Sequence, residues 1–552
     1  NDNRIETHES GTAPCKTACP AHVAVQGYLK LAAQGRYDEA LALIKRENPL
    51  PAICGRVCNR RCEDACTRGR VDEAVAIDEV KKFIAQRDLD AATRYIPPVV
   101  TPTRAGGFDQ KIAIIGAGPA GLSCAFYLAE KGYKPVVFEK NERPGGMLTY
   151  GIPSFKLQKD VIEAEVEVIR LMGAEFRYGV EVGRDVTLDE LRAQGFKAFY
   201  VAIGCQGGRL AGIPGEDAED VTVAVDFLRE VNSGKIDALP GRTIVVGGGN
   251  VAIDVARNAC RLGSEHVEMF CLESEAQMPA SEEERREAIE DGAHISCGWG
   301  PKEVHLDEAG RVCGITFKRC TRVYDEEGRF APEYDENDLR RVDADRVVMS
   351  IGQSIVWGDL LAGSKVELGR GQGALADHQT YQTAEPDIFV GGDVYTGPSF
   401  AIDAIAAGHE AAVSIHRFVQ PGSTLTIGRN QRRYTALDRD DVVIESYDNA
   451  SREVARVDRE REKAAPFSEY VETLTEEQVR AETARCLGCG ASIVDPNKCI
   501  GCGLCTTKCA FDAIHLDRDR PECSTMVKYE QKLPSLGKYA LKRAIKIKIG
   551  RK

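Results

Sequence analysis

The segment Lys111 to Lys140, KIAIIGAGPAGLSCAFYLAEKGYKPVVFEK, restricts the fold of this chain more than any other stretch. A short apolar run leads into a glycine-rich turn, then a stretch with helical apolar spacing, then a second apolar run that ends on Glu139. This order predicts the strand, turn, helix and strand of a dinucleotide site. The residues that we expect to face the dinucleotide are Gly116, Gly118, Pro119, Ala120, Gly121, Glu139 and Lys140.

The three glycines have separate expected roles. Gly116 permits the tight turn, Gly118 lets the backbone approach a pyrophosphate at the helix N-terminus, and Gly121 permits close packing of helix and strand. Glu139 can accept hydrogen bonds from a ribose. The alternative is a glycine-rich turn in some other α/β domain, and the acid at the expected distance argues against it.

A second stretch, Arg242 to Cys271, repeats the pattern. The predicted strand Thr243 to Val246 meets Gly247-Gly248-Gly249-Asn250-Val251-Ala252, and a helix and the strand Val267 to Cys271 follow. Two dinucleotide folds suggest one tightly held and one exchanging cofactor, and spacing alone leaves open which is which. The expected contacts at this second site are Gly247, Gly249, Asn250 and Val251.

Twelve of the twenty cysteines fall into three tight groups. In an intracellular protein, this many cysteines indicate metal ligands rather than disulfides. Thiolates suit iron-sulfur clusters, and structural zinc is the alternative. We interpret most of the other eight as small buried apolar residues. The groups are Cys15, Cys19, Cys54, Cys58, Cys62 and Cys66, then Cys486 and Cys489, then Cys499, Cys502, Cys505 and Cys509.

Charge and hydropathy exclude several classes of partner. A formal charge of -13 over 552 residues argues against nucleic acid and against an anionic membrane surface. No apolar run reaches the roughly 20 residues that span a bilayer. No secretory signal is visible, although the chain starts without Met, and we expect a cytoplasmic protein.

Five motifs, in order along residues 10 to 420, resemble the small (beta) subunit of glutamate synthase. The same motifs are similar to the flavin subunit of the NADH-dependent ferredoxin:NADP oxidoreductase and to the N-terminal half of dihydropyrimidine dehydrogenase. The motifs are NPLPAICGRVC, GGMLTYGIPSFKL, GGGNVAID, MPA and IFVGGDVYTGPSFAIDAIAAGHEAA. The resemblance implies FAD at the first site and a nicotinamide nucleotide at the second. It adds Gly146, Met147, Leu148, Gly392, Asp393 and Ala401 to the expected FAD contacts.

The resemblance also implies roles for two of these residues. Asp393 would accept a hydrogen bond from a hydroxyl of the FAD, and the helix starting near Ala401 would point its positive end toward the reduced flavin. Hydride transfer from nicotinamide C4 to flavin N5 is the chemistry of the cofactors themselves. We therefore assign no catalytic side chain.

The chain departs from its NADPH-using relatives after the second strand of the second site. Those relatives carry an Arg-Arg pair where this chain has Leu272 and Glu273. Arginines would bind a 2'-phosphate, whereas a carboxylate repels it and hydrogen-bonds ribose hydroxyls. We predict NADH over NADPH, the alternative being that Glu273 is a solvated loop charge.

A second departure concerns the N-terminal clusters. Relatives begin with an Arg-Cys-Leu-x-Cys segment that supplies two ligands, and here that segment stands at Arg485 to Cys489 instead. We expect it to fold back, so that one [4Fe-4S] cluster uses Cys15, Cys66, Cys486 and Cys489. The neighbouring cluster would use Cys19, Cys58, Cys62 and Cys54, because Lys81 occupies the position of a Gln or Glu in some relatives and an ammonium is no ligand.

A third departure is the extension Cys499 to Leu516, which resembles half of a bacterial-type ferredoxin. In two-cluster ferredoxins the fourth cysteine binds the other cluster. A competing assignment therefore gives Cys523 to the cluster of Cys499, Cys502 and Cys505, and joins Cys509 to Cys486 and Cys489. Either assignment favours three [4Fe-4S] clusters.

The expected fold is α/β, with two Rossmann-like domains for FAD and NAD(P)H between a helical Fe-S domain and a C-terminal ferredoxin-like Fe-S domain. The expected ranges are 1–107 for the helical domain, 108–240 and 356–420 for the two parts of the FAD domain, 241–355 for the NAD(P)H domain, 421–480 for a connector and 481–552 for the ferredoxin-like domain.

These inferences predict an electron-input subunit. NADH, or NADPH as the less favoured donor, would reduce FAD, and the clusters would carry single electrons to other redox subunits or to ferredoxin. An alternative is an electron-bifurcating oxidoreductase subunit. An alternative of another class is a non-catalytic metal-binding scaffold.

Overall fold

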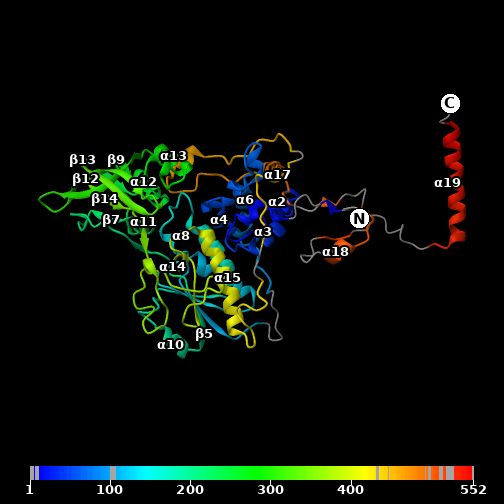
Figure 1. Cartoon of the computed structure of the whole chain (residues 1–552), viewed down its shortest axis with the longest axis horizontal. Coiled ribbons are helices and arrows are strands. Elements are labelled where there is room, and N and C mark those ends of the chain that lie inside the picture. The colour runs from blue at the N-terminus through cyan, green and yellow to red at the C-terminus, as the bar shows by residue number, and fades with distance from the viewer. Residues whose placement is uncertain are drawn as a thin grey trace. The chain divides into compact units, whose positions relative to one another are not determined.

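The computed structural model describes residues 5–6, 11–99, 107–430, 434–444, 447–490, 493–494, 499–508, 514–516 and 527–549. The chain divides into two compact units (Figure 1). One is Glu9–Gly490, and the other combines Asn1–His8 with Ala491–Lys552. We expected the last domain to begin at residue 481, but residues 481 to 490 belong to the larger unit.

The described N-terminal residues 11–99 form short helices and no strand element, as the sequence predicts. The stretch 25–46 forms two helices, whose apolar faces, with Leu29, Ala32, Leu41 and Ile44, are buried. The bounds are α1 (Pro14–Thr17), α2 (Val25–Ala33), α3 (Tyr37–Lys45), α4 (Pro51–Val57), α5 (Arg61–Asp64), a 3-10 turn (Thr67–Arg70) and α6 (Ile77–Leu89).

The first nucleotide domain has a five-stranded parallel sheet in the order β16-β5-β2-β3-β4. Strand β2 is central, and its residues 112 to 115 are buried, as expected for a parallel strand covered on both faces. The strands are β2 (Lys111–Ile115), β3 (Val136–Glu139), β4 (Glu175–Tyr178), β5 (Phe196–Val201) and β16 (Ile388–Val390). The helices are α7 (Pro119–Glu130), α8 (Met147–Tyr150), α9 (Lys159–Leu171), α10 (Leu188–Ala193), α14 (Asp393–Thr396) and α15 (Ala401–Val419).

The second nucleotide domain has a parallel sheet in the order β10-β9-β8-β14-β7. Strand β7 pairs with β14, so this domain extends back beyond the expected boundary at residue 241. The strands are β7 (Val221–Val223), β8 (Arg242–Val246), β9 (His266–Cys271), β10 (His294–Cys297) and β14 (Arg346–Met349). The helices are α11 (Ala224–Asn232), α12 (Asn250–Arg261) and α13 (Glu282–Glu290).

Two antiparallel additions accompany this domain. One is a three-stranded sheet of β11 (Trp299–Leu306), β12 (Val312–Tyr324) and β13 (Phe330–Val342). The other pairs β6 (Gly207–Gly208) with β15 (Gln353–Ser354), at the two crossings between the nucleotide domains. The two segments that connect the nucleotide domains are thus hydrogen-bonded to each other as paired strands, which holds them side by side.

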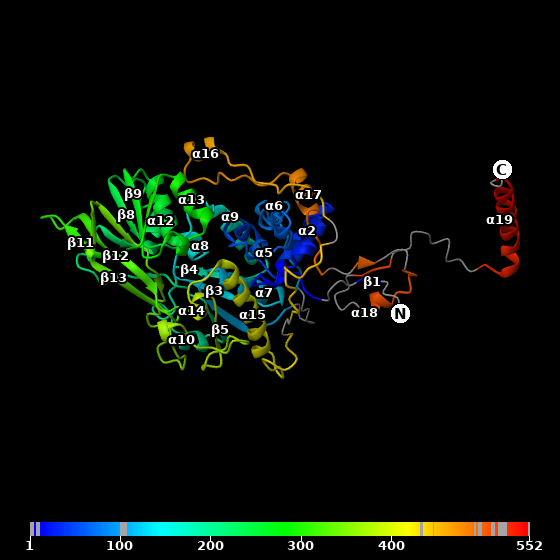
Figure 2. The ribbon, with the colours of Figure 1, turned by 45° about the horizontal axis from the view of Figure 1, so that its top comes forward.

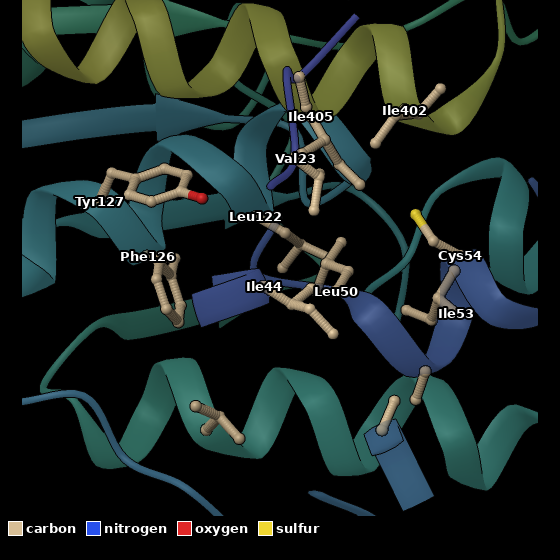
Figure 3. Close-up of a cluster of buried hydrophobic side chains, with 14 of the residues drawn as sticks. Val23, Ile44, Leu50, Ile53, Cys54, Leu122, Phe126, Tyr127, Ile402 and Ile405 are labelled. Atoms are coloured by element: carbon tan, nitrogen blue, oxygen red, sulfur yellow. The ribbon is translucent and has the colours of Figure 1, made fainter. Parts of the chain in front are cut away.

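The N-terminal helices and the first nucleotide domain share one hydrophobic core. Figure 3 shows Val23, Ile44, Leu50 and Ile53 of the N-terminal domain gathered with side chains of α7 and α15. Cys54 lies at the edge of this group (Figure 3). The shared core therefore fixes the cysteine-bearing helices against the first nucleotide domain.

The described residues between α15 and Gly490 pack against other parts of the larger unit. They include α16 (Arg459–Ala464), which lies beside α13, and α17 (Glu476–Ala484), which packs on α2 and α6 (Figure 2). In the smaller unit, β1 (Ile5–Glu6) pairs with β17 (Ile493–Val494), and α18 (Leu504–Lys508) and α19 (Tyr529–Ile549) follow. None of the helices in the described ranges is long and apolar enough to cross a membrane.

Candidate functional site

The first glycine turn has the geometry that its sequence predicts. Gly116 has φ of +104°, and a Cβ there would lie 2.4 Å from the carbonyl oxygen of Ala202. A Cβ on Gly121 would lie 1.9 Å from the carbonyl oxygen of Gly116, so α7 can approach β2 only without that side chain. A Cβ on Gly118 would meet nothing within 4 Å, because this backbone faces open space.

The carboxylate of Glu139 is buried and fixed at the same turn. It accepts hydrogen bonds from the backbone N–H of Ala117 at 2.8 Å and of Asn141 at 2.9 Å. One carboxylate therefore joins the turn to the end of β3, where the ribose of a bound dinucleotide is expected.

A cavity of about 220 Å³ lies over this turn. Its lining contains nearly every residue that we expected to contact FAD, although they come from three separate stretches of the chain. Gly121 is enclosed between helix and strand, and Lys140 lines a smaller neighbouring cavity of about 40 Å³. The expected residues in the larger cavity are Gly116, Gly118, Pro119, Ala120, Glu139, Gly146, Met147, Leu148, Gly392, Asp393 and Ala401.

The second nucleotide domain forms another wall of the same cavity. Val251 and Asp254 of α12 and Leu228 of α11 line it together with the first glycine turn. Val251 was an expected contact, whereas Asp254 was not, although it ends the GGGNVAID motif. Because α12 begins at the second glycine turn and lines this cavity with Val251 and Asp254, a nucleotide on the second turn can extend toward a flavin on the first.

Asp393, the first residue of α14, also lines the cavity and precedes α15 in the chain. The backbone N–H of Ser399 donates to its Oδ1 at 3.2 Å. Burial raises the pKa of Asp393 to about 6. Ala401, the first residue of α15, lines the cavity beside it, so the positive end of this long helix faces the same space.

Partly buried charges that the sequence analysis missed link the two nucleotide domains. The ammonium of Lys156 lies 2.6 Å from Asp254 Oδ1 and 2.9 Å from Glu284 Oε1. Burial opposes the charge, but these two carboxylates raise the pKa of Lys156. Burial lowers the pKa of the neighbouring Lys159 to about 7. Lys156 lies in the motif GIPSFKL and Asp254 in the motif GGGNVAID, but their contact is visible only in the folded chain.

The second glycine turn repeats the geometry of the first. Gly247 has φ of +142°, and a Cβ there would lie 2.2 Å from the carbonyl oxygen of Ser350. A Cβ on Gly249 would meet nothing within 4 Å. Asn250 begins α12, and its side-chain oxygen accepts from the backbone N–H of Ser281 at 3.3 Å, next to the MPA motif. The Glu273 carboxylate lies over this turn, with Oε2 3.0 Å from the position of a Cβ on Gly248.

Four cysteines from the two ends of the larger unit meet at one small cavity. Cys15, Cys66, Cys486 and Cys489 line it together with apolar side chains such as Leu29. Burial raises the pKa of the Cys15 thiol, and the other three thiols raise it further because they lie close by. This is the set that the fold-back of the Arg-Cys-Leu-Gly-Cys segment predicts.

Arg485, which directly precedes Cys486 in the chain, fixes this segment to the N-terminal domain. Its buried guanidinium lies 2.6 Å from the carboxylate of Glu482 and 3.0 Å from that of Asp72, and it donates to the carbonyl of Glu73 at 2.6 Å. Glu482 in turn accepts from the backbone N–H of Ala76 at 2.7 Å. The end of α17 is therefore bound to the residues that follow Cys66.

Three cysteines of the second expected set, Cys54, Cys58 and Cys62, lie near Lys81, and the fourth is Cys19. Burial raises the pKa of the Cys54, Cys58 and Cys62 thiols, and the Lys81 ammonium opposes this. Cys19 lies near enough to raise the pKa of Cys58. The ammonium of Lys81 pairs with Asp78. Lys81 thus lies beside the thiols, as its position in the sequence suggested.

Cys499, Cys502 and Cys505 belong to the smaller unit, whereas Cys509 and Cys523 lie outside the described residues. Within the described part of the chain, no three His, Cys, Asp or Glu side chains could hold a single metal ion. A four-iron cluster spaces its thiolates more widely, because each binds a different iron. The cavity where the four thiols of Cys15, Cys66, Cys486 and Cys489 meet fits such a group.

Comparison with known families assigns most of the chain. Residues 110–408 match the pyridine nucleotide-disulphide oxidoreductase family. Residues 8–93 match dihydropyrimidine dehydrogenase domain II with its 4Fe-4S cluster, and residues 492–515 match a 4Fe-4S binding domain. The glutamate synthase [NADPH] small chain of Escherichia coli is 35% identical over 74% of this chain and 89% of its own length. This chain belongs to the glutamate synthase small-subunit family.

Two further relatives are components of other oxidoreductases. The beta subunit of NADP(+)-dependent formate dehydrogenase from Moorella thermoacetica is 34% identical over 87% of this chain and 70% of its own length. The beta subunit of NADPH-Fe(3+) oxidoreductase from Geobacter sulfurreducens is 32% identical over 74% of this chain and 64% of its own length.

Membership of this family makes the chain an NAD(P)H-dependent FAD and iron-sulfur oxidoreductase that transfers electrons. The resemblance, the fold class and the cofactor types FAD, NAD(P)H and [4Fe-4S] are confirmed. The zinc interpretation of the cysteine groups and the non-catalytic scaffold are therefore set aside.

Proposed function

We propose that this chain is an electron-input subunit that oxidises NADH in preference to NADPH and delivers single electrons, by way of three [4Fe-4S] clusters, to a partner redox protein or ferredoxin. The observation that carries the proposal is the single cavity lined by the first glycine turn and by Val251 and Asp254 of α12, the helix that follows the second turn. When bound there, FAD supplies the exchange between a hydride and single electrons. The residues of this chain bind and orient the two nucleotides.

The backbone of each turn performs the binding. Gly118 and Gly249 leave open space in front of the N-termini of α7 and α12, so a pyrophosphate can lie against backbone N–H groups. Glu139 would hold the ribose of the first nucleotide and Glu273 that of the second. Val251 and Asp254 face the space where the reacting ends would meet.

The proposed preference for NADH is based on Glu273. Its carboxylate lies over Gly248, where the adenosine ribose of a nucleotide on this turn would approach. A 2'-phosphate at that ribose would bring two negative groups together. The relatives in Escherichia coli and Geobacter sulfurreducens are named for NADPH, so this chain would differ from them in donor.

For the clusters, we propose Cys15, Cys66, Cys486 and Cys489 as one ligand set and Cys19, Cys54, Cys58 and Cys62 as another. The first set is supported by its common cavity and by the anchoring of Arg485. The third set would be Cys499, Cys502, Cys505 and Cys509. The competing set with Cys523, electron bifurcation and the cytoplasmic location stay predictions.

The test is an anaerobic titration of the purified chain with NADH and, separately, NADPH. Absorbance of the flavin and of the clusters would be followed together, and iron would be determined per chain. We expect NADH to bleach the flavin at much lower concentration than NADPH, and about twelve irons per chain. Lack of reduction by either nucleotide would refute the input role, and equal response to both would refute the NADH preference alone.

A further inference from the structure

Two cysteines outside the three ligand groups lie side by side at the edge of the second nucleotide sheet. Cys271 is the last residue of β9 and Cys297 is the last residue of β10, and the two are register partners. Their sulfur atoms are 3.7 Å apart. Neighbouring strands lie about 4.8 Å apart, within the roughly 4.4 to 6.8 Å between Cα atoms that a disulfide requires.

Cys271 also touches the second glycine turn. Its sulfur lies 3.5 Å from the position that a Cβ on Gly248 would occupy, and 3.6 Å from the backbone carbonyl oxygen of Glu273. The Glu273 carboxylate approaches the same point on Gly248 to 3.0 Å. The thiol therefore lies directly beneath the turn and the loop that would hold the adenosine ribose.

The two thiols differ in access to solvent. Cys271 is buried, whereas Cys297 is half-buried, so a dissolved oxidant would meet Cys297 first. Burial and the neighbouring Cys297 raise the pKa of the Cys271 thiol, which keeps it protonated in the resting pair. Cys313 on β12 serves as a comparison in this domain, because its sulfur lies 3.5 Å from the carbonyl oxygen of His305.

We propose that Cys271 and Cys297 are an oxidative modification site, at which a small disulfide such as oxidised glutathione forms an intrachain disulfide that weakens nicotinamide nucleotide binding at the second site. The binding effect rests on the proposed function, whereas formation of the disulfide does not depend on it.

The chemistry is thiol-disulfide exchange in two steps. The Cys297 thiolate attacks one sulfur of the oxidant, forms a mixed disulfide and displaces one glutathione thiolate. Cys271 then gives its proton to the glutathione thiolate displaced in the first step, attacks the Cys297 sulfur as a thiolate and displaces the second glutathione as a thiolate, which takes a proton from water. Two protein thiols are oxidised, one small disulfide is reduced to two thiols, and an added dithiol reverses both steps.

Closing the bond would disturb the nucleotide turn. The sulfurs must approach from 3.7 Å to about 2.05 Å. That movement draws the Cys271 side chain from beneath Gly248 toward β10 and shifts the loop that leads to Glu273. We expect the KM for the nucleotide to rise about tenfold, a typical effect for a displaced contact. FAD content should not change, because the pair lies in the other sheet.

The experiment uses the FAD- and cluster-loaded chain, kept anaerobic, after incubation with oxidised glutathione or with dithiothreitol. Peptide mass spectrometry would detect the Cys271 to Cys297 link, and NADH-driven ferricyanide reduction would give the KM. We expect the linked peptide and the higher KM only after oxidation, with reversal by dithiothreitol. Cys297→Ser should abolish both effects, and Cys297→Ala would replace it if the serine variant fails to fold. The matched control Cys313→Ser should show the same linked peptide and the same rise in KM after oxidation as the chain without substitutions.

Two results would overturn the proposal. One is absence of the linked peptide after oxidation of the folded chain. The other is a linked peptide accompanied by the same KM in oxidised and reduced protein. If the reduced chain oxidises neither NADH nor NADPH, the proposed function fails instead, and the peptide measurement still decides whether the thiols pair.

Discussion

Glu165 on α9 shows what one buried carboxylate contributes to this protein. Its two oxygens accept hydrogen bonds from the backbone N–H groups of Ala52 at 2.7 Å and Ile53 at 2.9 Å, at the start of α4. That helix carries Cys54. The first nucleotide domain thus holds the cysteine-bearing helix through a single side chain that satisfies two otherwise orphan donors.

The ionisation of Glu165 predicts a dependence of stability on pH. Burial, assisted by Asp88, raises the pKa of Glu165 to about 8, above the value of about 4.3 in an unfolded chain. Between these values the folded protein keeps a proton that the unfolded chain has released, so its stability falls as pH rises through that window. Between pH 5 and 8, the melting temperature of the Glu165→Gln variant should fall less than that of the chain with Glu165. Circular dichroism on the anaerobic holoprotein would measure both melting temperatures. The exposed Glu163→Gln should keep the original slope, and an unchanged slope in Glu165→Gln would contradict the assignment.

Glu273 predicts the choice of nucleotide. Glu273→Arg replaces a carboxylate by a group that binds phosphate, so the ratio of kcat/KM for NADPH to that for NADH should rise at least about tenfold. Steady-state ferricyanide reduction measures both constants. Glu275→Arg, an exposed change on the same loop, should leave the ratio nearly unchanged. Equal ratios in Glu273→Arg and the unmodified chain would show that Glu273 is only a solvated charge.

Among the elements, helix α17 and the turn after it bring the last residues of the larger unit into contact with its N-terminal helices. A capping box starts the helix, since Thr475 and Gln478 bond reciprocally. The buried Glu482 and Arg485 at its end hold residues of the N-terminal domain. The position of Cys486 and Cys489 therefore depends on a short helix fixed by buried charges.

Replacement of both cysteines of this turn should remove one cluster. The Cys486→Ser and Cys489→Ser double variant should contain about four fewer irons per chain while it keeps FAD. Iron analysis and the flavin spectrum give the two values. The control is Cys124→Ser, at a buried position on α7 outside the ligand groups, and this variant should keep the full iron content of the chain. A double variant with full iron content would exclude these cysteines as ligands.

At the scale of the whole molecule, the unit Glu9–Gly490 contains both nucleotide domains, the N-terminal helices and eight of the expected cysteine ligands. Its hydrophobic core joins the N-terminal helices to the first nucleotide domain. Of the expected ferredoxin-like ligands, the described ones, Cys499, Cys502 and Cys505, belong to the other unit. The residues proposed for the input chemistry and the ligands proposed for its first two clusters thus belong to one compact unit.

This division predicts the behaviour of two shortened chains. A chain ended after Gly490 should keep FAD, NADH-driven ferricyanide reduction and about eight irons. A chain ended after Ala484 should keep FAD and about four irons, because it lacks the Arg485 to Cys489 segment. Iron per flavin distinguishes them. If the longer of the two keeps only about four irons, the competing assignment, in which Cys509 joins Cys486 and Cys489, gains support.

The two glycine turns and the strands and helices around them follow from neighbouring residues and could be predicted from the amino-acid order alone. Gly116 and Gly247 have positive φ and no room for a Cβ, and both turns follow the strands and precede the helices that the apolar pattern predicts. The reason is local: a tight turn with backbone exposed to a ligand requires glycine at fixed positions. The family motifs added the FAD contacts that line the cavity.

Contacts between residues far apart in the chain became visible only in the folded structure. The contact of Lys156 with Asp254 and Glu284, the pairing of β7 with β14 and the proximity of Cys271 to Cys297 all depend on how separate segments pack. Local periodicity cannot predict such pairs, because it specifies the buried face of an element and not its neighbour. The meeting of Cys15 with Cys486 was predicted from a displaced motif, and the buried charges around Arg485 give its physical cause.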